Sequence, residues 1–569
     1  MRSITRLAAL LSFIAAVILS SWSGVTAEDK PADWKTEMLD VQIPMRDEKK
    51  LAADVYLPKK VGKYPAILIQ TPYNKSNTGK AIKRTGDIGD SGRGSGSDLS
   101  IFDYDNYAYV VVDWRGFFGS KAALTSGERP RRGEDGYDCV EWIAGQEWCN
   151  GKVGTWGGSA LAKQQFDTMV EQPPHLVCAA PLIAPMGFAY YDYYEGGILL
   201  EGHVEMLDKL GFGVGEIVRK FPRSDGAPWK LARQLAKGPS NIKVPCLMIS
   251  GWWDNYTDRV LETFDDLCTI AGDQTNKHSR LIMGPWDHVS VGLAKQGDCD
   301  FKGAEKESGR AAMAFFDYWL RDMKDNGWDK TPRIRYWQCF EGGKGEWRSA
   351  EKWEDIKRSW KHMFLTAEGG IQADALSTRA AKEAPLTRKY TYDPLNPCPT
   401  LGGANLPPMP HGPTDQSDLG KRPDVLSYTS AAFGEPLHLN GNIELSIWFA
   451  ANRKDCDLFM RVCDVGPDGK AILIAEAARR AKYRNVAYSV QELIAGDQNN
   501  TVLRCPATAY TLQKGHKLRL YISSGNYPRY ERNTHTLADH WDNQSAKSVE
   551  VTVFHDKDAY ADLTLPCAQ

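Results

Sequence analysis

Five apolar runs of strand length recur between residues 64 and 288, and each is bounded by turn residues. They read YPAILIQTPY, YAYVVVDWRG, GKVGTWGGS, VPCLMISGWWD and SRLIMGPWDH. Their apolarity is continuous rather than alternating, which is typical of strands that are covered on both faces. Between the second and third runs, the segment GEDGYDCVEWIAGQ (133–146) carries apolar residues at roughly helical spacing. This succession of strands and helices predicts an α/β fold with a mostly parallel sheet.

A residue whose side chain can act as an acid, a base or a nucleophile lies close to the C-terminal end of each run. These residues are Tyr73, Asp113, Ser159, Asp254 and His288. The carboxyl ends of parallel strands meet at one edge of the sheet, where sites form in open α/β folds. Polar residues also end strands for ordinary turn reasons, and this alternative applies most strongly to Asp113. The set as a whole predicts a reaction centre at that edge.

The chain of 569 residues exceeds the size at which single cores stop growing, so we expect two or three domains. We assign residues 28–185 and 243–360 to the catalytic domain, whose closing helix is GRAAMAFFDYWLRDMK (309–324). Between its two parts, residues 186–242 include the sequence FAYYDYYEGGILLEGHVEMLDKL, which is rich in aromatic residues and has a helical pattern. This segment predicts a helical cap inserted over the sheet edge, although a further pair of packing helices would have the same pattern.

After residue 360 the apolar runs change from continuous to alternating. Residues 380–415 are rich in Pro, Asn and Gly, and short alternating runs such as IELSIWFAA, LFMRVCDV, KLRLYISS and SVEVTVF follow. Alternation is typical of antiparallel strands with one buried face, so we expect residues 361–569 to form an all-β sandwich or jelly roll.

Charge and motif content restrict the class of partner. The chain has 70 basic and 72 acidic residues and no long block of either sign, which argues against a nucleic acid or a membrane surface bound through net charge. It has no Cys-x-x-Cys or His-Glu-x-x-His spacing, so we expect no metal and no cofactor. The expected partner is a small, largely uncharged substrate. The oligomeric state stays open, and a homo-oligomer is among the alternatives.

The N-terminus has the pattern of an export signal. Arg2 and Arg6 precede a mostly apolar stretch, and small residues lead to a cleavage point after Ala27, so residues 1–27 are assigned to a signal peptide. The apolar stretch is too short for a bilayer of about 30 Å, which makes a retained membrane anchor the weaker alternative. We therefore expect a mature chain that is exported, either to a periplasm or out of the cell.

Twelve cysteines in an exported chain allow disulfides. Cys456 and Cys463 are the closest pair in the sequence, and spacing alone does not give the pairing. Cys178 and Cys246 lie in apolar runs, where a buried free thiol is the expected state.

Ser159 follows a strand-like run and two glycines. A serine exposed on a sharp strand-to-helix turn takes strained backbone angles and needs small neighbours. Gly157 and Ala160 meet this need, whereas Leu161 stands where the Gly-x-Ser-x-Gly pattern has its second glycine. A serine nucleophile also needs a base, and the base needs a third group that fixes its tautomer. Ser159, Asp254 and His288 supply these groups in the chain order of α/β-hydrolases.

Motifs in both halves of the chain resemble those of a known family of serine hydrolases. In the first half they are TPYNK, VVVDWRGFFGS, GKVGTWGGSALA, SGWWDNY and MGPWDH, and in the second half RPDVLSYTS, ARRAKYRN and GNYPRYERN. They are similar to motifs of the cocaine esterase, glutaryl acylase and α-amino-acid ester hydrolase family, whose relatives include the X-Pro dipeptidyl-peptidases. The resemblance spans almost the whole mature chain. It implies an α/β-hydrolase fold with an inserted helical cap, followed by a β domain.

The resemblance also implies roles for single residues. Ser159 would be the nucleophile, His288 the general base and Asp254 the acid that orients the histidine. The hydroxyl of Tyr73 and the backbone N–H of Ala160 would form the oxyanion hole.

Further positions follow from the same resemblance. Tyr256 and Met186 match positions that line the substrate's acyl pocket, while Asp113 and Arg115 would be structural. The chain departs from the family around the serine, where alanines stand in place of a tyrosine and a glycine at 160 and 162. The oxyanion donor survives this change, but one wall of the site loses a side chain.

The acidic cluster that binds a substrate ammonium in amino-acid ester hydrolases has no counterpart here. Asp254 is followed by Asn255, Tyr256 and Thr257, and Asp258 stands alone. We therefore predict an exported serine hydrolase that cleaves carboxylic esters or amides. An X-Pro dipeptidyl-peptidase is the first alternative. The second is an inactive hydrolase that serves as a carbohydrate-binding module.

Overall fold

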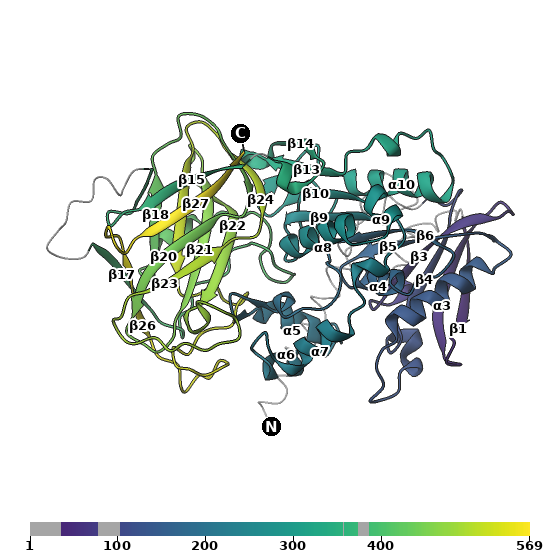
Figure 1. Ribbon diagram of the computed structural model, residues 1–569, viewed down its shortest axis with the longest axis horizontal. Coiled ribbons are helices and arrows are strands. Elements are labelled where there is room, and N and C mark those ends of the chain that lie inside the picture. The colour runs from purple at the N-terminus through teal and green to yellow at the C-terminus, as the bar shows by residue number, and fades with distance from the viewer. Residues whose placement is uncertain (1–35, 78–102, 357, 374–385, 569) are drawn as a thin grey trace, which may run out of the picture.

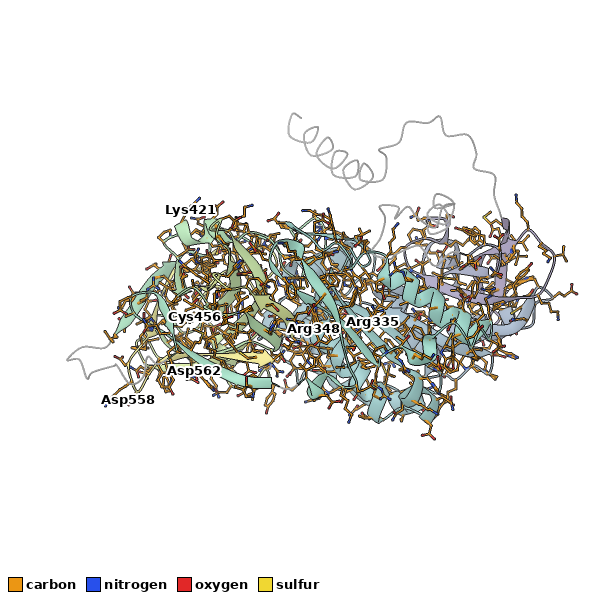
Figure 2. The ribbon with its side chains drawn as sticks, turned by 90° about the horizontal axis from the view of Figure 1, so that it is seen from above. Arg335, Arg348, Lys421, Cys456, Asp558 and Asp562 are labelled. Atoms are coloured by element: carbon orange, nitrogen blue, oxygen red, sulfur yellow. The ribbon has the colours of Figure 1, made fainter. Side chains whose placement is uncertain are left out.

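The computed structural model describes residues 36–77, 103–356, 358–373 and 386–568. The predicted signal peptide, residues 1–27, lies outside these ranges. The described chain forms an α/β half and a β half that lie side by side along the longest axis of the molecule (Figure 1). Arg335 and Arg348 lie near the middle of the elongated molecule when it is seen from above (Figure 2). Among the described residues, no helix has both the length and the apolarity to cross a membrane.

A mainly parallel sheet forms the centre of the α/β half. Its strands lie in the order β1 (Thr36–Pro44), β2 (Lys50–Pro58), β4 (Ala108–Asp113), β3 (Tyr64–Thr71), β5 (Cys149–Gly158), β6 (Leu176–Leu182), β9 (Leu247–Trp253), β10 (Arg280–Asp287), β13 (Ile334–Cys339) and β14 (Gly345–Ala350). Neighbouring strands from β4 to β13 are parallel, whereas β1, β2 and β14 pair antiparallel at the edges. The predicted mostly parallel sheet is therefore confirmed.

Two separate cores explain why the central strands are continuously apolar. On β3, Ala66 and Leu68 belong to one core cluster, and Ile67 and Ile69 belong to another. Successive side chains of a strand point to opposite faces of the sheet. Both faces of this strand are therefore covered, so neither set of positions is polar.

Helices cover the two faces. The first face packs on α3 (Arg132–Ala144), α4 (Ala160–Met169) and α8 (Thr257–Thr269), and the second face packs on α10 (Glu307–Leu320). The predicted helices 133–146 and 309–324 correspond to α3 and α10. The run pattern does not predict β1, β2, β6, β13 or β14. In the described part of β1 the residues mostly alternate between exposed and less exposed, as expected at an edge.

The chain between β6 and β9 holds the short helices α5 (Glu201–Lys209), α6 (Gly215–Lys220) and α7 (Ala227–Leu235). Tyr190, Tyr194 and Trp229 belong to a small aromatic cluster at its centre, where the two tyrosine rings stack with centroids 4.6 Å apart. The Tyr530 hydroxyl of the β half donates to the Glu195 carboxylate at 2.6 Å. This helical insertion therefore packs on itself and also contacts the β half.

Antiparallel ladders build the β half. One ladder has the order β18 (Val425–Ser430), β25 (Lys517–Ser523), β21 (Asp457–Val465) and β22 (Ala471–Arg480). Another has the order β17 (Thr387–Tyr392), β26 (Val549–Phe554), β20 (Glu444–Ala451) and β23 (Asn499–Arg504). The four alternating runs of the sequence lie on β20, β21, β25 and β26. The first strand of this half, β15 (Arg358–Leu365), pairs with the last, β27 (Ala561–Ala568).

All twelve cysteines lie in the described part of the chain, and all are free thiols. Cys178 and Cys246 are fully buried, which confirms that prediction. Cys456 and Cys463 are also buried and unpaired, and Figure 2 places Cys456 inside the β half. The disulfides that the cysteine count allows are therefore not formed among the described residues. Within the same ranges, no group of three or more His, Cys, Asp or Glu side chains is arranged to hold a metal ion.

Candidate active site

Ser159 lies on a sharp turn between β5 and α4. Its backbone has φ 58° and ψ −121°, a strained combination for a residue with a side chain. Gly157 has φ 141°, and a Cβ added there would lie 2.6 Å from the Cβ of Leu161. Leu161, at the position where the common pattern has glycine, thus packs over Gly157 and requires that glycine. The turn is held by the Ser159 N–H, which donates to the Leu182 carbonyl at 2.9 Å.

The structure brings Ser159, Asp254 and His288 together at the carboxyl edge of the sheet. Ser159 Oγ lies 2.9 Å from His288 Nε2, and His288 Nδ1 lies 2.7 Å from Asp254 Oδ1. Asp254 and His288 follow β9 and β10 directly and are almost fully buried. In this geometry the imidazole can take the serine proton while the carboxylate fixes the tautomer.

Ser250 of β9 supports the buried carboxylate that follows this strand. Its hydroxyl donates to Asp254 Oδ2 at 2.7 Å, so each oxygen of the carboxylate has a hydrogen-bond partner. Burial without such partners would cost a carboxylate several kcal/mol. Ser250 is not among the residues predicted from the sequence, although its spacing of four residues from Asp254 in SGWWD is a local signal for this contact.

A contact from the β half holds the loop that carries His288. Asp287 Oδ1 accepts the backbone N–H groups of Val289 and Ser290, both at 2.9 Å. Asp287 Oδ2 lies 2.6 Å from Nδ1 of His411, which comes from the β half, and this interaction raises the pKa of His411. Sequence reasoning missed this pair, because residues 287 and 411 are brought together only by the packing of the two halves.

Two hydrogen-bond donors flank the serine. The Tyr73 side chain forms a hydrogen bond with that of Ser159, and burial raises the pKa of Tyr73 to about 12, so its hydroxyl keeps its proton at neutral pH. The Tyr73 ring packs edge-on against Phe212 with centroids 6.3 Å apart. Ala160 is the first residue of α4, and an N–H at that position has no carbonyl partner within its own helix. Both donors have the chemistry that an oxyanion hole needs.

Tyr256 and Met186 lie in different surroundings. The Tyr256 ring is buried and packs edge-on against the His288 ring, with centroids 5.8 Å apart. Met186 is partly buried against the main core cluster, and its backbone N–H donates to Thr263 Oγ1 at 3.1 Å. Tyr256 therefore borders the reaction centre directly. The substrate-binding roles of both residues stay predictions.

Lys163 ties the helix that follows Ser159 to the helical insertion. Its Nζ donates to the Gly187 carbonyl at 2.8 Å and to Asp192 Oδ2 at 3.1 Å. Arg259 reaches the other carboxylate oxygen of Asp192 at 3.6 Å. Asp192 thus already faces two cations and is not a free anchor for a substrate ammonium.

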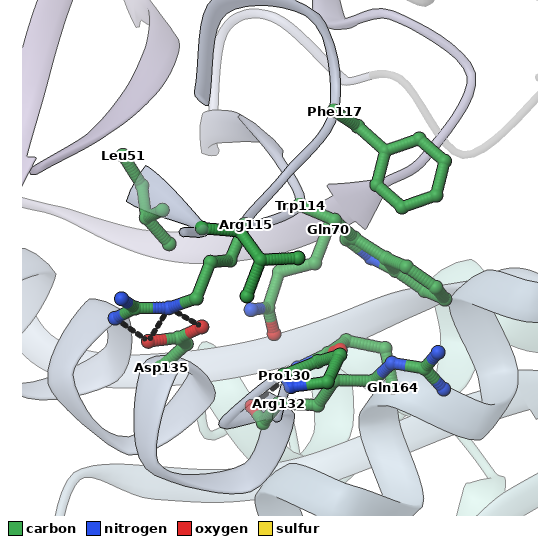
Figure 3. Close-up of a pocket in the computed structure, with 10 residues that line it drawn as sticks. Leu51, Gln70, Trp114, Arg115, Phe117, Pro130, Arg132, Asp135 and Gln164 are labelled. Atoms are coloured by element: carbon green, nitrogen blue, oxygen red, sulfur yellow. Dashed lines mark hydrogen bonds and ion pairs between the residues drawn. The ribbon is translucent and has the colours of Figure 1, made fainter. Parts of the chain in front are cut away.

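The DWRG motif lines a cavity on the α3 side of the sheet (Figure 3). Arg115 is buried and forms ion pairs with Asp135 at 2.6 Å and with Asp47 at 2.8 Å. Asp113 accepts the backbone N–H of Lys75 at 2.6 Å. Arg115 and Asp113 therefore hold the loops beside β4 and do not reach the serine.

The fold and the site together define the class of the protein: it is a serine hydrolase with an α/β-hydrolase fold and a C-terminal β domain. The model of the X-Pro dipeptidyl-peptidase (S15 family) matches residues 47–220 and 216–290, and that of the X-Pro dipeptidyl-peptidase C-terminal non-catalytic domain matches residues 326–561. Together the two models cover most of the chain, which places it in the serine-hydrolase family of these peptidases, and cocaine esterase is a relative.

Relatives and solved structures match nearly the full length of the chain. Cocaine esterase from Rhodococcus sp. (strain MB1 Bresler) is 27% identical over 555 residues, which cover 87% of this chain and 92% of the esterase. A putative serine esterase of Mycobacterium bovis is 23% identical over 611 residues and covers 85% of this chain and 90% of its own. The structure of an aminopeptidase from a Thaumarchaeota archaeon has a TM-score of 0.77 at 19% identity and covers 96% of this chain and 99% of its own. An α-amino acid ester hydrolase has a TM-score of 0.74 at 21% identity, with coverages of 96% and 98%.

Proposed function

We propose that the protein hydrolyses carboxylic esters or amides through an acyl-enzyme on Ser159. The observation that carries this proposal is the continuous hydrogen-bonded chain from Ser159 through His288 to Asp254, with both distances below 3.0 Å. Such a chain supplies a nucleophile, a base and a group that fixes the base.

In the proposed reaction, Ser159 Oγ attacks the carbonyl carbon while His288 Nε2 removes the hydroxyl proton. The Tyr73 hydroxyl and the Ala160 N–H stabilise the tetrahedral oxyanion. His288 then passes its proton to the leaving alcohol or amine, which departs and leaves the acyl group on Ser159. Water, deprotonated by the same imidazole, attacks the acyl-enzyme. The bond between Ser159 Oγ and the acyl carbon then breaks as His288 returns the proton to Oγ, which releases the acid and restores the serine.

The tyrosine is tested by removing its hydroxyl alone. We expect Tyr73→Phe to lower kcat/KM for p-nitrophenyl acetate about 10²-fold, because one oxyanion donor is lost. The ring stays in place against Phe212, so the melting temperature should change little. Tyr191→Phe, on an exposed tyrosine of the helical insertion, is the matched control. A Tyr73→Phe enzyme within threefold of the wild type would show that this hydroxyl is not an oxyanion donor.

The X-Pro dipeptidyl-peptidase alternative needs a carboxylate that receives the substrate's N-terminal ammonium. Asp192 faces Lys163 and Arg259, and Glu195 faces Arg529 at 3.3 Å. These paired carboxylates favour the esterase or acylase over the peptidase. The inactive, carbohydrate-binding alternative is disfavoured because the Ser159–His288 contact is intact.

One set of assays separates the three candidate functions. The purified chain is treated with a fluorophosphonate probe, which reacts quickly only with an activated serine, and is assayed on p-nitrophenyl acetate and on Gly-Pro p-nitroanilide. We expect labelling at Ser159, located by peptide mass spectrometry, and clear preference for the ester. Faster cleavage of the anilide would favour the peptidase, whereas neither labelling nor turnover would favour the inactive hydrolase.

The proposal includes the finer organisation of the chain. We propose that residues 186–242 act as a cap, that residues 28–185 and 243–360 form the catalytic domain and that the C-terminal β domain, residues 361–569, is a jelly roll. We also propose that residues 1–27 direct export, so that the enzyme meets a small ester or amide outside the cytoplasm.

A further inference from the structure

The turn that carries His288 is built around Asp287, whose side chain is fully buried. Asp287 Oδ1 accepts the backbone N–H groups of Val289 and Ser290, both at 2.9 Å. Because His288 lies between Asp287 and Val289 in the chain, these hydrogen bonds fix the backbone from which the imidazole extends. That backbone determines whether His288 Nε2 lies within reach of Ser159 Oγ, which is 2.9 Å away.

Gln296 closes the loop behind this turn. Its side-chain oxygen accepts the Asp287 N–H at 2.9 Å. Its Nε2 donates to the carbonyls of Ser290 at 2.8 Å and of Leu293 at 2.9 Å, and the whole side chain is buried. Residues 287–296 therefore form a braced loop, yet none of these contacts uses Asp287 Oδ2.

The β half supplies the partner of Asp287 Oδ2. His411 Nδ1 lies 2.6 Å from this oxygen, and the hydrogen bond to Asp287 raises the pKa of His411, which favours the charged imidazolium. Among the residues that the structure describes, no lysine or arginine forms an ion pair with Asp287. A carboxylate that is buried without a counterion is strongly destabilised. His411 is therefore the counterion of Asp287.

The loop that carries His411 is held by its own hydrogen bonds. Gly403 and Gly412 exchange backbone hydrogen bonds at 2.9 Å and 2.8 Å. The side-chain amide of Asn405, which is itself buried, donates to the Pro410 carbonyl at 2.8 Å. Both chain neighbours of His411 are thus fixed, so the imidazole extends from a backbone of defined position.

Backbone contacts seat the two loops on each other. The Asp298 N–H donates to the Pro413 carbonyl at 2.8 Å, and Asp298 Oδ2 accepts the Asp415 N–H at 2.9 Å. A Cβ added at Gly412 would lie 2.8 Å from the backbone nitrogen of Gly297, which is closer than a Cβ atom can approach. A glycine at this position therefore lets the two backbones come together, and the histidine before it reaches the carboxylate.

We propose that His411 is a positioning residue for the reaction, because through Asp287 it holds the turn that presents His288 to Ser159. The β half, which carries no member of the triad, thereby completes the catalytic centre. The inference rests on the proposed hydrolysis by Ser159. A catalytic group that is displaced by about 1 Å can lose about 10²-fold in rate, so a hydrogen bond that fixes this turn acts on turnover as well as on stability.

His411→Leu tests the hydrogen bond. We expect it to lower kcat for p-nitrophenyl acetate about tenfold or more, because Asp287 Oδ2 loses its donor and the turn loosens. KM should stay within about threefold, because His288 acts in both acylation and deacylation and both steps slow together. His411→Asn should recover most of kcat, since its NH₂ group takes the place of Nδ1 and can donate to the same oxygen.

The charge of the pair provides a readout that a loss of stability would not move. Both variants leave the Asp287 carboxylate without a cation beside His288, and a nearby negative charge favours the imidazolium. The acid limb of the pH profile of kcat/KM should therefore move to higher pH, by about 0.5 pH units or more, in both variants. In an Asp287→Asn background the charge is absent, so adding His411→Leu should cause no such movement.

The matched control is His362→Leu, which removes an exposed histidine of the β half that pairs with Asp562 at 3.1 Å. It should leave kcat and the acid limb unchanged. Wild-type kcat in His411→Leu, or equal losses in both His411 variants with the acid limb unmoved, would show that His411 does not position the imidazole. If His411→Leu does not fold, the pH profile of His411→Asn decides. A wild type with neither ester turnover nor fluorophosphonate labelling would instead overturn the proposed function, and this inference with it.

Discussion

Ser159→Ala is expected to lower kcat for p-nitrophenyl acetate about 10⁴-fold or more, because the acyl-enzyme has no oxygen on which to form. Fluorophosphonate labelling should disappear in the same variant. The fold should be retained, since the Ser159 N–H that bonds to Leu182 is a backbone group. Alanine at a backbone φ of 58° keeps the strain that the serine already carries, so unfolding should occur near the wild-type temperature.

The control for this loss is Ser240→Ala, an exposed serine outside the triad. It should match the wild type in turnover and labelling. If Ser159→Ala kept full turnover of the ester, the nucleophile would have to be another group, and the mechanism on this edge of the sheet would be wrong.

Asp254→Asn should lower kcat nearly as much as Ser159→Ala does, by about 10³- to 10⁴-fold near neutral pH. An amide has the shape of the carboxylate, but its NH₂ group can donate to His288 Nδ1, which favours the tautomer whose proton is on Nε2. That nitrogen then cannot accept the proton of Ser159, 2.9 Å away. Ser250 keeps a partner in the amide, so the loss should appear in kcat and not in the melting temperature.

Asp265→Asn, on an exposed aspartate of α8, is the matched control because it makes the same chemical change outside the triad. Steady-state kinetics and thermal unfolding of the two variants give the comparison. Equal activity of Asp254→Asn and the wild type would mean that the carboxylate does not orient the imidazole.

The serine elbow shows how much of the site local sequence can predict. Gly157, Ser159 and Ala160 are neighbours in the chain, and their small size follows from the strained turn they form. Tyr73, Asp254 and His288 are far apart in sequence, yet they share one rule: each follows a buried parallel strand at its carboxyl end. The predicted triad residues therefore lie within hydrogen-bonding distance of one another.

The contacts that the β half makes with the catalytic half cannot be predicted from local sequence. His411 reaches Asp287 from the β half, and Arg529 reaches Glu195 of the helical insertion from another loop of that half. Neither loop has a periodicity or spacing that indicates its partner. The cysteines are a similar case, since composition allowed disulfides and the fold buries all but one of the twelve thiols without pairing any of them.

The α/β sheet and its serine, aspartate and histidine can be predicted from local sequence, because each depends on a few adjacent residues. The signals are the apolar period, a glycine at a positive φ and the polar residues at strand ends. The pairing of charges, such as that of Arg529 with Glu195, depends on how the insertion and the β half pack on that sheet. Such packing joins residues hundreds of positions apart. It is selected by the burial of whole surfaces, which no short stretch of chain encodes.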